Sequence, residues 1–599
     1  MLYPSMTPSR FVSDLSGIWD FAFDNEKGME EKWYEKPLAE PLSMPVPSSY
    51  NDLTESITNR EHYGWVFYQK KISVPSFVKG QRVVLRCDAV THHARIYLNG
   101  ELLATHECGF LPFEVELTEK LQTGENLLTV AVSNIIDYTT LPVGGKADMM
   151  GGMMGNAAEE TEKKPVNHPN FDFFNYAGIN RPIRIYTTPK DYISDISVVS
   201  EVHGNNAELI YEVETKGEGA CLVEAFDREG RKVAECSGTK GVLKIENVHL
   251  WQPLKAYLYE IKVTFGEDVY TLPYGVRTVR VDGTRFLINE KPFYFKGYGK
   301  HEDTFPAGRG LNLPMNVKDI SLMKWQGANS FRTSHYPYAE EWYQMADEEG
   351  FLIIDEVPAV GLMRSFTNYL AAGTGSSYTG FFRGDHVEKL QKHHLQAVEE
   401  MIIRDKNHPS VFAWSIFNEA ETTSPFAHDY FAPVFARARE LDIQHRPLTG
   451  ALEKSSGPDC CQVYPLMDFV CLNRYYGWYI HGGVMEDAEA EFLEEMDQWA
   501  IHYPGHPFIF TEYGTDTLPE MHRLPASMWS QEYQDEYMEM YAKVFDRYPW
   551  VVGELAWNFA DFQTGQGIMR VGGNRKGVFT RERQPKQTAH LLRRRWETK

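Results

Sequence analysis

The alternation of apolar and polar residues divides the chain into three regions with different predicted elements. In the first region, up to about residue 188, short apolar runs of β-type composition alternate with turn residues, as in Trp65-Val66-Phe67-Tyr68. The pair Asn99-Gly100 is typical of a hairpin turn, because both residues tolerate positive φ. Many short strands of this kind predict a jelly-roll β-sandwich over residues 1–188.

The second region, residues 189–281, is predicted to be a smaller β-sandwich of the immunoglobulin-like type. Its apolar runs have strand length and are separated by turn residues. No residue in this region has obvious chemistry, so we interpret it as a spacer domain. The predicted strands are 195–199, 207–213, 220–226, 242–245 and 257–265.

The third region, residues 282–599, alternates strand-like runs with amphipathic helical stretches, which indicates a parallel α/β domain. Eight such repeats in about 300 residues fit a closed (β/α)₈ TIM barrel better than an open sheet. The predicted strands are 293–298, 328–334, 351–357, 411–418, 448–451, 469–475, 508–513 and 551–559, of which the fifth has the weakest pattern. The predicted helices are 317–326, 339–349, 389–405, 428–441, 488–502 and 529–547.

Two of these predicted strands end in a glutamate. The fourth ends in Asn418-Glu419 and the seventh carries Glu512 near its end. Chemistry in a TIM barrel takes place at the carboxyl ends of the strands, and strands four and seven face each other across the barrel mouth. Two carboxyl groups about 5 Å apart would flank one bond, as retaining glycoside hydrolysis requires. Asp303 and Asp355-Glu356 are weaker candidates, as supporting or structural acids.

The composition excludes several classes of protein. The 599 residues are 43% hydrophobic and include 34 Phe, 33 Tyr and 13 Trp, which is enough to fill several cores and argues against disorder. The formal net charge of −23 argues against a nucleic-acid or anionic-membrane partner, because these need basic patches. The seven cysteines form no Cys-x-x-Cys motif, and neither a signal peptide nor an 18-residue apolar run is evident. The sequence therefore indicates a soluble protein of a reducing cytosol.

Two long motifs resemble the signatures of family two glycoside hydrolases. Residues 329–337 read Asn-Ser-Phe-Arg-Thr-Ser-His-Tyr-Pro, and residues 405–410 read Asp-Lys-Asn-His-Pro-Ser and run on to Asn418-Glu419. The resemblance covers the whole chain, since members of this family carry a jelly-roll, an immunoglobulin-like domain and a barrel in this order. It implies that Glu419 is the acid/base, that Glu512 is the nucleophile and that Asn418 binds the sugar 2-hydroxyl.

A glycine-flanked basic loop, residues 567–577, follows the last predicted strand and could hold an acidic sugar. Its Asn574-Arg575-Lys576 resembles the Asn-x-Lys motif by which the β-glucuronidases of this family bind the C6 carboxylate. Asp172 matches an aspartate that reaches the sugar hydroxyls from the first domain. The same resemblance implies further sugar contacts at His335, Asn473, Tyr475, Tyr479, Trp557 and Arg570.

The resemblance implies a retaining β-glucuronidase that needs no cofactor or metal and acts on small-molecule glucuronides. The insertion 363–385 resembles the loop that overhangs the site in gut-bacterial β-glucuronidases, which implies small aglycones and a homo-oligomer, a tetramer. A second long excursion is predicted at residues 144–168. Two alternatives remain open. One is a β-galactosidase or β-mannosidase of the same family, and the other is an inactive carbohydrate-binding protein.

Overall fold

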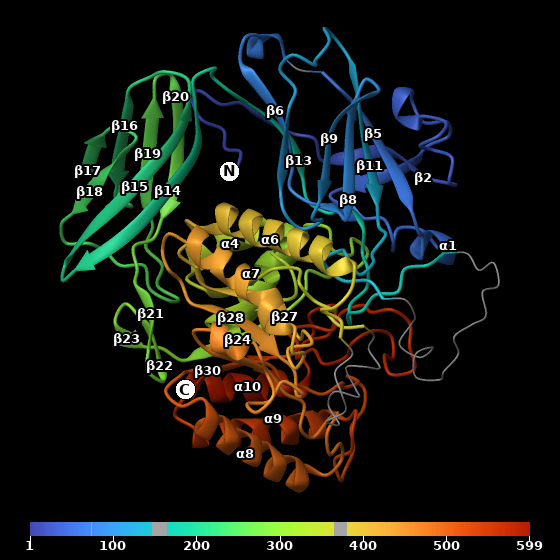
Figure 1. The fold of residues 1–599 in the computed structure, drawn as a ribbon, viewed down its shortest axis with the longest axis vertical. Coiled ribbons are helices and arrows are strands. Elements are labelled where there is room, and N and C mark those ends of the chain that lie inside the picture. The colour runs from blue at the N-terminus through green and yellow to red at the C-terminus, as the bar shows by residue number, and fades with distance from the viewer. Residues whose placement is uncertain (74, 146–164, 365–379) are drawn as a thin grey trace.

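The structure is a computed structural model of the chain, and it describes residues 1–73, 75–145, 165–364 and 380–599. Figure 1 shows two β domains, from the first half of the chain, lying against one side of an α/β domain. Most of the predicted excursion 144–168, and the middle of the insertion 363–385, lie outside the described residues. Within the described part, no helix has the length and apolarity needed to span a membrane.

The first domain consists of antiparallel sheets around one core, as the jelly-roll prediction requires. Phe21, Tyr68, Leu85 and Ile96 are fully buried in that core. One sheet contains β1 (Val12–Asp14), β13 (Ile183–Thr188), β6 (Arg82–Cys87) and β10 (Phe113–Glu116). The six-stranded sheet contains β3 (Leu42–Val46), β2 (Gly17–Phe23), β5 (Trp65–Ile72), β11 (Asn126–Ser133), β8 (His93–Leu98) and β9 (Glu101–Glu107). A small third sheet contains β4 (Ser48–Ser49), β12 (Gly178–Ile179) and β7 (Val90–Thr91).

The second domain is a sandwich of two sheets, and each of the five predicted runs overlaps one of its strands. The first sheet contains β14 (Tyr192–His203), β15 (Asn206–Lys216) and β18 (Lys240–Ile245). The second contains β17 (Lys232–Ser237), β16 (Cys221–Phe226), β19 (Tyr259–Phe265) and β20 (Asp268–Tyr274). The prediction missed β17 and β20. Strand β17 buries none of its residues, so it carries no apolar pattern that sequence reasoning could detect.

The third domain is a closed barrel of eight parallel strands, and each one overlaps a predicted strand. They are β24 (Phe295–Lys300), β25 (Ser330–Thr333), β26 (Leu352–Glu356), β27 (Val411–Asn418), β28 (Leu448–Leu452), β29 (Val470–Asn473), β30 (Phe508–Glu512) and β31 (Val551–Ala556). The six predicted helices correspond to α3 (Leu313–Gln326), α4 (Glu340–Glu349), α6 (His386–Asp405), α7 (Ala427–Leu441), α8 (Met485–His502) and α9 (Gln531–Arg547). The last helix, α10 (Gln587–Thr598), was not predicted and packs against α3 and α9. The predicted fold class is confirmed.

Buried ion pairs hold the first domain against the barrel. Arg184 on β13 binds Glu341 of α4, with 2.9 Å between Nη2 and Oε1, and Arg86 on β6 binds Glu340 of the same helix. Arg181 binds Glu302 at 3.0 Å. Breaking a buried pair leaves an uncompensated charge, so these contacts fix how the two domains meet. The meeting of the domains matters because a loop of the first domain reaches the barrel mouth.

A small antiparallel sheet closes the other end of the barrel, below the amino ends of its strands. It consists of β21 (Val279–Asp282), β22 (Arg285–Ile288) and β23 (Lys291–Pro292). Phe286 of β22 is fully buried and meets the rings of Phe295, Phe412 and Phe469 edge to face, at centroid distances of 5.0, 5.3 and 5.4 Å. This aromatic cluster fills the barrel floor, so the open end for chemistry is the opposite one.

Phe286→Ala is therefore expected to lower the free energy of unfolding by about 3–5 kcal/mol, the usual cost of removing a buried phenylalanine ring. Chemical denaturation followed by tryptophan fluorescence measures this loss. Because the ring lies at the floor, turnover of the folded variant at 25 °C should stay close to wild type. A large loss of turnover in the folded variant would show that the aromatic cluster also affects the geometry of the cavity at the carboxyl ends of the strands.

Candidate active site

A cavity of about 430 Å³ opens at the carboxyl ends of the barrel strands. All the sequence-predicted site residues line this one cavity: Asp172, His335, Asn418, Glu419, Asn473, Tyr475, Tyr479, Glu512, Trp557, Arg570, Asn574 and Lys576. The lining combines apolar and aromatic walls with a few convergent polar groups, as ligand sites usually do. Both candidate glutamates therefore face the same ligand space.

The ends of two barrel strands, β27 and β30, position the two glutamates. Glu512 is the last residue of β30, and Glu419 directly follows β27 with a φ of +48°, in the left-handed region. Between them, the end of β29 supplies one contact to each acid. Asn473 donates to Glu419 Oε1 at 3.0 Å, and the Tyr475 hydroxyl donates to Glu512 Oε2 at 2.6 Å. A non-glycine residue held at positive φ is strained, which is common where a backbone aims a functional side chain.

A buried guanidinium holds Glu512. Arg332 on β25 bonds to Glu512 Oε1 through Nη2, and through Nη1 it reaches both oxygens of Glu356, at 2.9 and 2.8 Å. His335 Nδ1 and the Ser415 hydroxyl bond to Glu356 as well, at 2.9 and 2.7 Å. Burial raises the pKa of Glu356, but Arg332 and His335 lower it by more, so it lies below its ordinary value. Glu356 therefore keeps a negative charge that orients Arg332 toward Glu512.

The electrostatic environment separates the roles of the two glutamates. Burial raises the pKa of Glu419 well above its ordinary value, and the charge of Glu512 raises it further, against a smaller opposing effect of the Asn473 hydrogen bond. Glu512 instead receives one donor on each oxygen, Arg332 and Tyr475, which suits a carboxylate anion. An acid that keeps its proton beside an ionised partner is the arrangement that glycoside hydrolysis uses.

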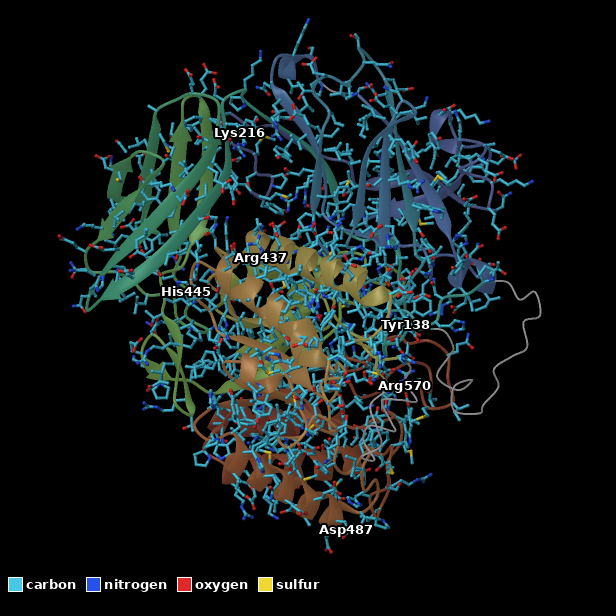
Figure 2. The ribbon with its side chains drawn as sticks, viewed as in Figure 1. Tyr138, Lys216, Arg437, His445, Asp487 and Arg570 are labelled. Carbon is cyan, nitrogen blue, oxygen red and sulfur yellow. The ribbon has the colours of Figure 1, made fainter. Side chains whose placement is uncertain are left out.

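A cluster of charged and amide groups forms another wall of the cavity. Asp172, from a loop of the jelly-roll domain, accepts two bonds from Arg570 Nε, at 2.9 and 3.0 Å, and one from Asn574 Nδ2 at 3.0 Å. The Tyr479 hydroxyl accepts from Arg570 at 2.9 Å and from Lys576 Nζ at 2.8 Å. Figure 2 shows Arg570 on the side of the barrel that faces the first domain. Three donors thus converge where an anionic group could bind.

The rings of His335 and Trp557 stack on each other in a third wall, at a centroid distance of 5.1 Å and an interplanar angle of 21°. Trp557 follows β31, and the tip of its ring lies against Gly299 of β24, where a Cβ would meet Trp557 Cε3 at 2.6 Å. The glycine is therefore required for this close approach. The aromatic face exposed to the cavity suits the apolar face of a sugar ring.

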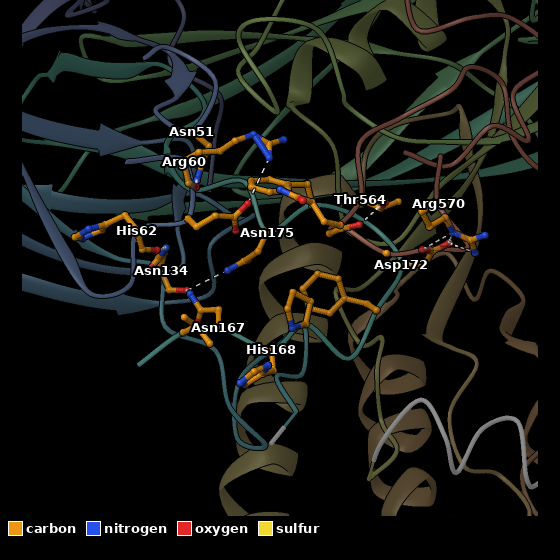
Figure 3. Close-up of a pocket in the computed structure, with 18 of the residues that line it drawn as sticks. Asn51, Arg60, His62, Asn134, Asn167, His168, Asp172, Asn175, Thr564 and Arg570 are labelled. Carbon is orange, nitrogen blue, oxygen red and sulfur yellow. Dashed lines mark hydrogen bonds and ion pairs between the residues drawn. The ribbon is translucent and has the colours of Figure 1, made fainter. Parts of the chain in front are cut away.

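A second cavity, of about 360 Å³, adjoins the first (Figure 3). The two share Phe171, Asp172, Met569 and Arg570 as lining residues, so the Asp172–Arg570 pair forms part of the wall between them. Asn134, Asn167 and Asn175 also line the second cavity, and each amide NH₂ bonds to a backbone carbonyl, as in the 3.0 Å bond from Asn167 to the Asn134 oxygen. These hydrogen bonds hold together the loops of the first domain that line the second cavity.

Some residues of the site were missed or underrated by the sequence analysis. Glu356, read only as a supporting acid, is the partner of Arg332, while Asp303 binds Arg581 at 2.6 Å and does not line the catalytic cavity. Glu453 and Lys454 follow β28 and line the cavity on the Glu419 side. The sequence analysis could have found Glu453 and Lys454, since both closely follow a predicted barrel strand. Asp516, behind Lys576, lies four residues after Glu512 and had no such signal.

Comparison with known proteins places this geometry in a family. Residues 279–599 match the domain described as "Glycosyl hydrolases family 2, TIM barrel domain", residues 12–189 match the sugar binding domain of that family, and residues 183–277 match a further domain described as "Glycosyl hydrolases family 2". The chain belongs to family 2 of the glycosyl hydrolases. The resemblance of its two motifs to this family is thereby confirmed.

Relatives that resemble the chain over its full length include proteins described as β-glucuronidases. The chain is 44% identical to the β-glucuronidase of Paenibacillus borealis, covering all of this chain and 98% of that protein. It is 40% identical to the human β-glucuronidase, covering all of this chain and 92% of the relative. The structure of Ruminococcus gnavus β-glucuronidase in complex with uronic isofagomine superposes with a TM-score of 0.95 at 48% identity, covering all of this chain and 98% of that one.

Proposed function

We propose that the chain is a retaining β-glucuronidase, which hydrolyses β-D-glucuronides to glucuronic acid and an aglycone. The observation that carries this proposal is the placement of Arg570, Asn574 and Lys576 in the same cavity as Glu419 and Glu512. The two glutamates would carry out glycoside hydrolysis, and the Arg570, Asn574 and Lys576 side chains would bind the carboxylate of an acidic sugar. The full-length relatives described as β-glucuronidases support it.

In the proposed mechanism, Glu512 attacks the anomeric carbon while Glu419 gives its proton to the glycosidic oxygen. The bond between that carbon and oxygen breaks, the aglycone leaves with the proton, and the glucuronosyl group stays as an ester on Glu512. Glu419 is now a carboxylate and takes a proton from a water molecule, whose oxygen attacks the same carbon and releases Glu512. Two inversions at one carbon give net retention.

Other side chains of the cavity are proposed to orient the sugar. Asn418 and Asn473 lie beside Glu419, with 3.1 Å between Asn473 Nδ2 and Asn418 Oδ1, and Asn418 would bind the sugar 2-hydroxyl while Asn473 makes a further sugar contact. Tyr475 fixes the attacking oxygen of Glu512, and Trp557 offers the sugar an aromatic face. Asn574 and Lys576 would bind the C6 carboxylate. Asn574 must then release Asp172, which turns to a sugar hydroxyl.

A β-galactosidase or β-mannosidase of the same family fits the cavity less well. A neutral sugar has no carboxylate for Asn574 and Lys576 to bind. Their side chains would then keep only their hydrogen bonds to acids of the protein, Asp172 and Asp516. An inactive carbohydrate-binding protein is also disfavoured, because both glutamates face one cavity. Hydrolysis of p-nitrophenyl β-D-glucuronide compared with the β-D-galactoside and β-D-mannoside tests the proposal. Preference for a neutral sugar would overturn it.

Lys576→Ala is expected to lower kcat/KM for the glucuronide by about 30- to 100-fold, since hydrogen bonds to charged groups contribute about 1.5–3 kcal/mol. Turnover of the neutral galactoside should not fall. Lys406→Ala is a matched control, because Lys406 is also buried and pairs with an acid, Asp195, without lining the cavity. The control should lose stability and keep its sugar preference. Equal losses in both variants would remove Lys576 from the recognition site.

The assembly and location of the protein are further parts of the proposal. We propose a homotetramer that acts on small conjugates, on the basis of the resemblance of residues 363–385 to a loop of gut-bacterial β-glucuronidases. The proposed cytoplasmic location rests on the seven cysteines, all of which are free thiols. The apolar side chains of Val360, Met363 and Ile480 line the cavity and suit a small aromatic aglycone. Light scattering on the purified protein measures the assembly, and a panel of glucuronides with aglycones of increasing size measures the preference.

A further inference from the structure

Asp516 is a buried acid behind the cationic wall of the cavity. It lies in the loop after β30 and is fully buried. Its Oδ2 lies 2.5 Å from Lys576 Nζ and 3.5 Å from Arg570 Nη1, and its Oδ1 accepts the backbone N–H of Arg575 at 2.8 Å. The residue does not line the cavity, so it acts on a ligand only through Lys576 and Arg570.

The wall therefore holds two cations and two acids, and the two acids differ. Asp516 has no exposed side-chain surface and is bound from two sides, whereas the Asp172 side chain is 34% exposed and enters from the jelly-roll domain. Figure 3 shows Asp172 and Arg570 facing each other at the edge of the second cavity. Asp172 also takes the Asn574 amide that a ligand carboxylate would need. Asp172 can therefore turn away from Arg570 and Asn574 when a ligand binds, whereas Asp516 stays bound to Lys576.

We infer that Asp516 is a positioning residue that makes the site selective for a single carboxylate on the sugar. The inference rests on the proposed function and deepens it. With Asp172 turned away, Lys576, Arg570 and Asp516 leave a net charge of +1, which one carboxylate neutralises. Asp516 also fixes the direction of the Lys576 ammonium, whose other polar contact among the described residues is the Tyr479 hydroxyl at 2.8 Å. A lysine held from behind points its free N–H at the ligand.

The electrostatics of the pair agree with this role. Burial raises the pKa of Asp516, but Lys576 and then Arg570 lower it by more, so the pKa lies below its ordinary value. The group is thus a permanent anion under working conditions. The negative charge of Asp516 weakens the attraction of this wall for a ligand carboxylate. It also neutralises one of the two positive charges of Lys576 and Arg570, which would otherwise lack a counter-charge once Asp172 turns away.

Binding of a matched pair of ligands tests the inference without catalysis. Uronic isofagomine carries the carboxylate, and isofagomine lacks it, so the ratio of their affinities isolates the carboxylate contribution. Titration calorimetry of the wild type and of Asp516→Asn gives that ratio. We expect Asp516→Asn to weaken uronic isofagomine by about 30-fold, the scale of one hydrogen bond to a charged group, and isofagomine by less than about threefold. In kinetics the loss should fall mainly on KM for the glucuronide.

Asp442→Asn is the matched control. Asp442 is also buried, directly after α7, and pairs with Arg446 at 2.7 Å, but it does not line the cavity. Its loss should reduce the melting temperature and leave the affinity ratio unchanged. Asp516→Glu is the second variant, in case Asp516→Asn does not fold. It keeps the charge and displaces it by one methylene, so it should lower the ratio by a smaller factor.

The outcomes separate the inference from the function on which it rests. If the wild type binds both ligands equally, the proposed function fails, and the inference fails with it. If the wild type prefers uronic isofagomine and Asp516→Asn keeps the whole preference, only the inference fails. A loss of both affinities together, or a ratio change in Asp442→Asn as large as in Asp516→Asn, would assign Asp516 a structural role and overturn the inference as well.

Discussion

Glu512→Gly is expected to abolish glucuronide hydrolysis, with a fall in kcat of about 10⁴-fold or more, the scale seen when a nucleophile is removed. The substitution also opens space beside Arg332, where an added anion can bind. Azide should therefore restore turnover of p-nitrophenyl glucuronide. Because azide then attacks in a single displacement, its product should be the α-glucuronosyl azide, in inverted configuration. Proton NMR of the product gives the configuration.

The rescue separates a nucleophile from an acid with a structural role. Glu554 on the neighbouring strand β31 is also fully buried, and it binds Arg595 at 2.8 Å. Glu554→Gly should lose stability, and azide should restore nothing. A β-configured azide product from Glu512→Gly, or residual hydrolysis near wild type, would exclude Glu512 as the nucleophile.

Glu419→Gln is expected to slow the hydrolysis of glucuronides with poor leaving groups, such as phenyl glucuronide, by about 10³-fold, within the usual range for general acid catalysis. An aglycone with a low pKa needs little protonation, so the first step on p-nitrophenyl glucuronide should suffer far less. The second step still lacks its base, and the glycosyl-enzyme should accumulate. A rapid burst of p-nitrophenol followed by slow turnover measures that accumulation.

The same variant changes the pH dependence. In the proposed mechanism Glu419 acts as an acid only while protonated, and its pKa lies well above the ordinary value because of burial and the charge of Glu512. Wild-type activity should therefore persist at neutral pH and fall as pH rises through that raised pKa. Glutamine cannot ionise, so Glu419→Gln should lack this alkaline fall in kcat/KM. An unchanged alkaline limb in the variant would assign the titration to another group.

The barrel and its two glutamates were predictable because both depend on local pattern. Barrel strands are buried on both faces, so each one reads as an apolar run, and β27 is buried at every position. The end of such a run marks the active face, which is why Glu419 and Glu512 stood out. Even the weak fifth strand was correct, since β28 is fully buried although it has only five residues.

The residues that tune the site were less predictable, because their partners lie far away in the sequence. Arg332 and Glu356 are 24 positions apart, and Arg332 and Glu512 are 180 apart. The pair of Asp516 with Lys576 spans 60 positions. A single sequence carries no signal for the pairing itself, since neither member shows by its own position which distant residue it contacts. The left-handed backbone at Glu419 is likewise invisible at a non-glycine position.

The wall formed by Asp172 and Arg570 bears on how this kind of enzyme can change its substrate. The two residues are 398 positions apart and belong to different domains, yet they share one set of hydrogen bonds. A recombination event between the domains would bring together halves of the wall from two parents. Phe110, Leu111 and Phe173 of the first domain also pack into the hydrophobic cluster of the barrel, so both the stability and the sugar preference of a chimera would depend on whether the two halves still fit. The sugar preference would therefore be kept only if the segments that carry Asp172 and Arg570 came from the same parent.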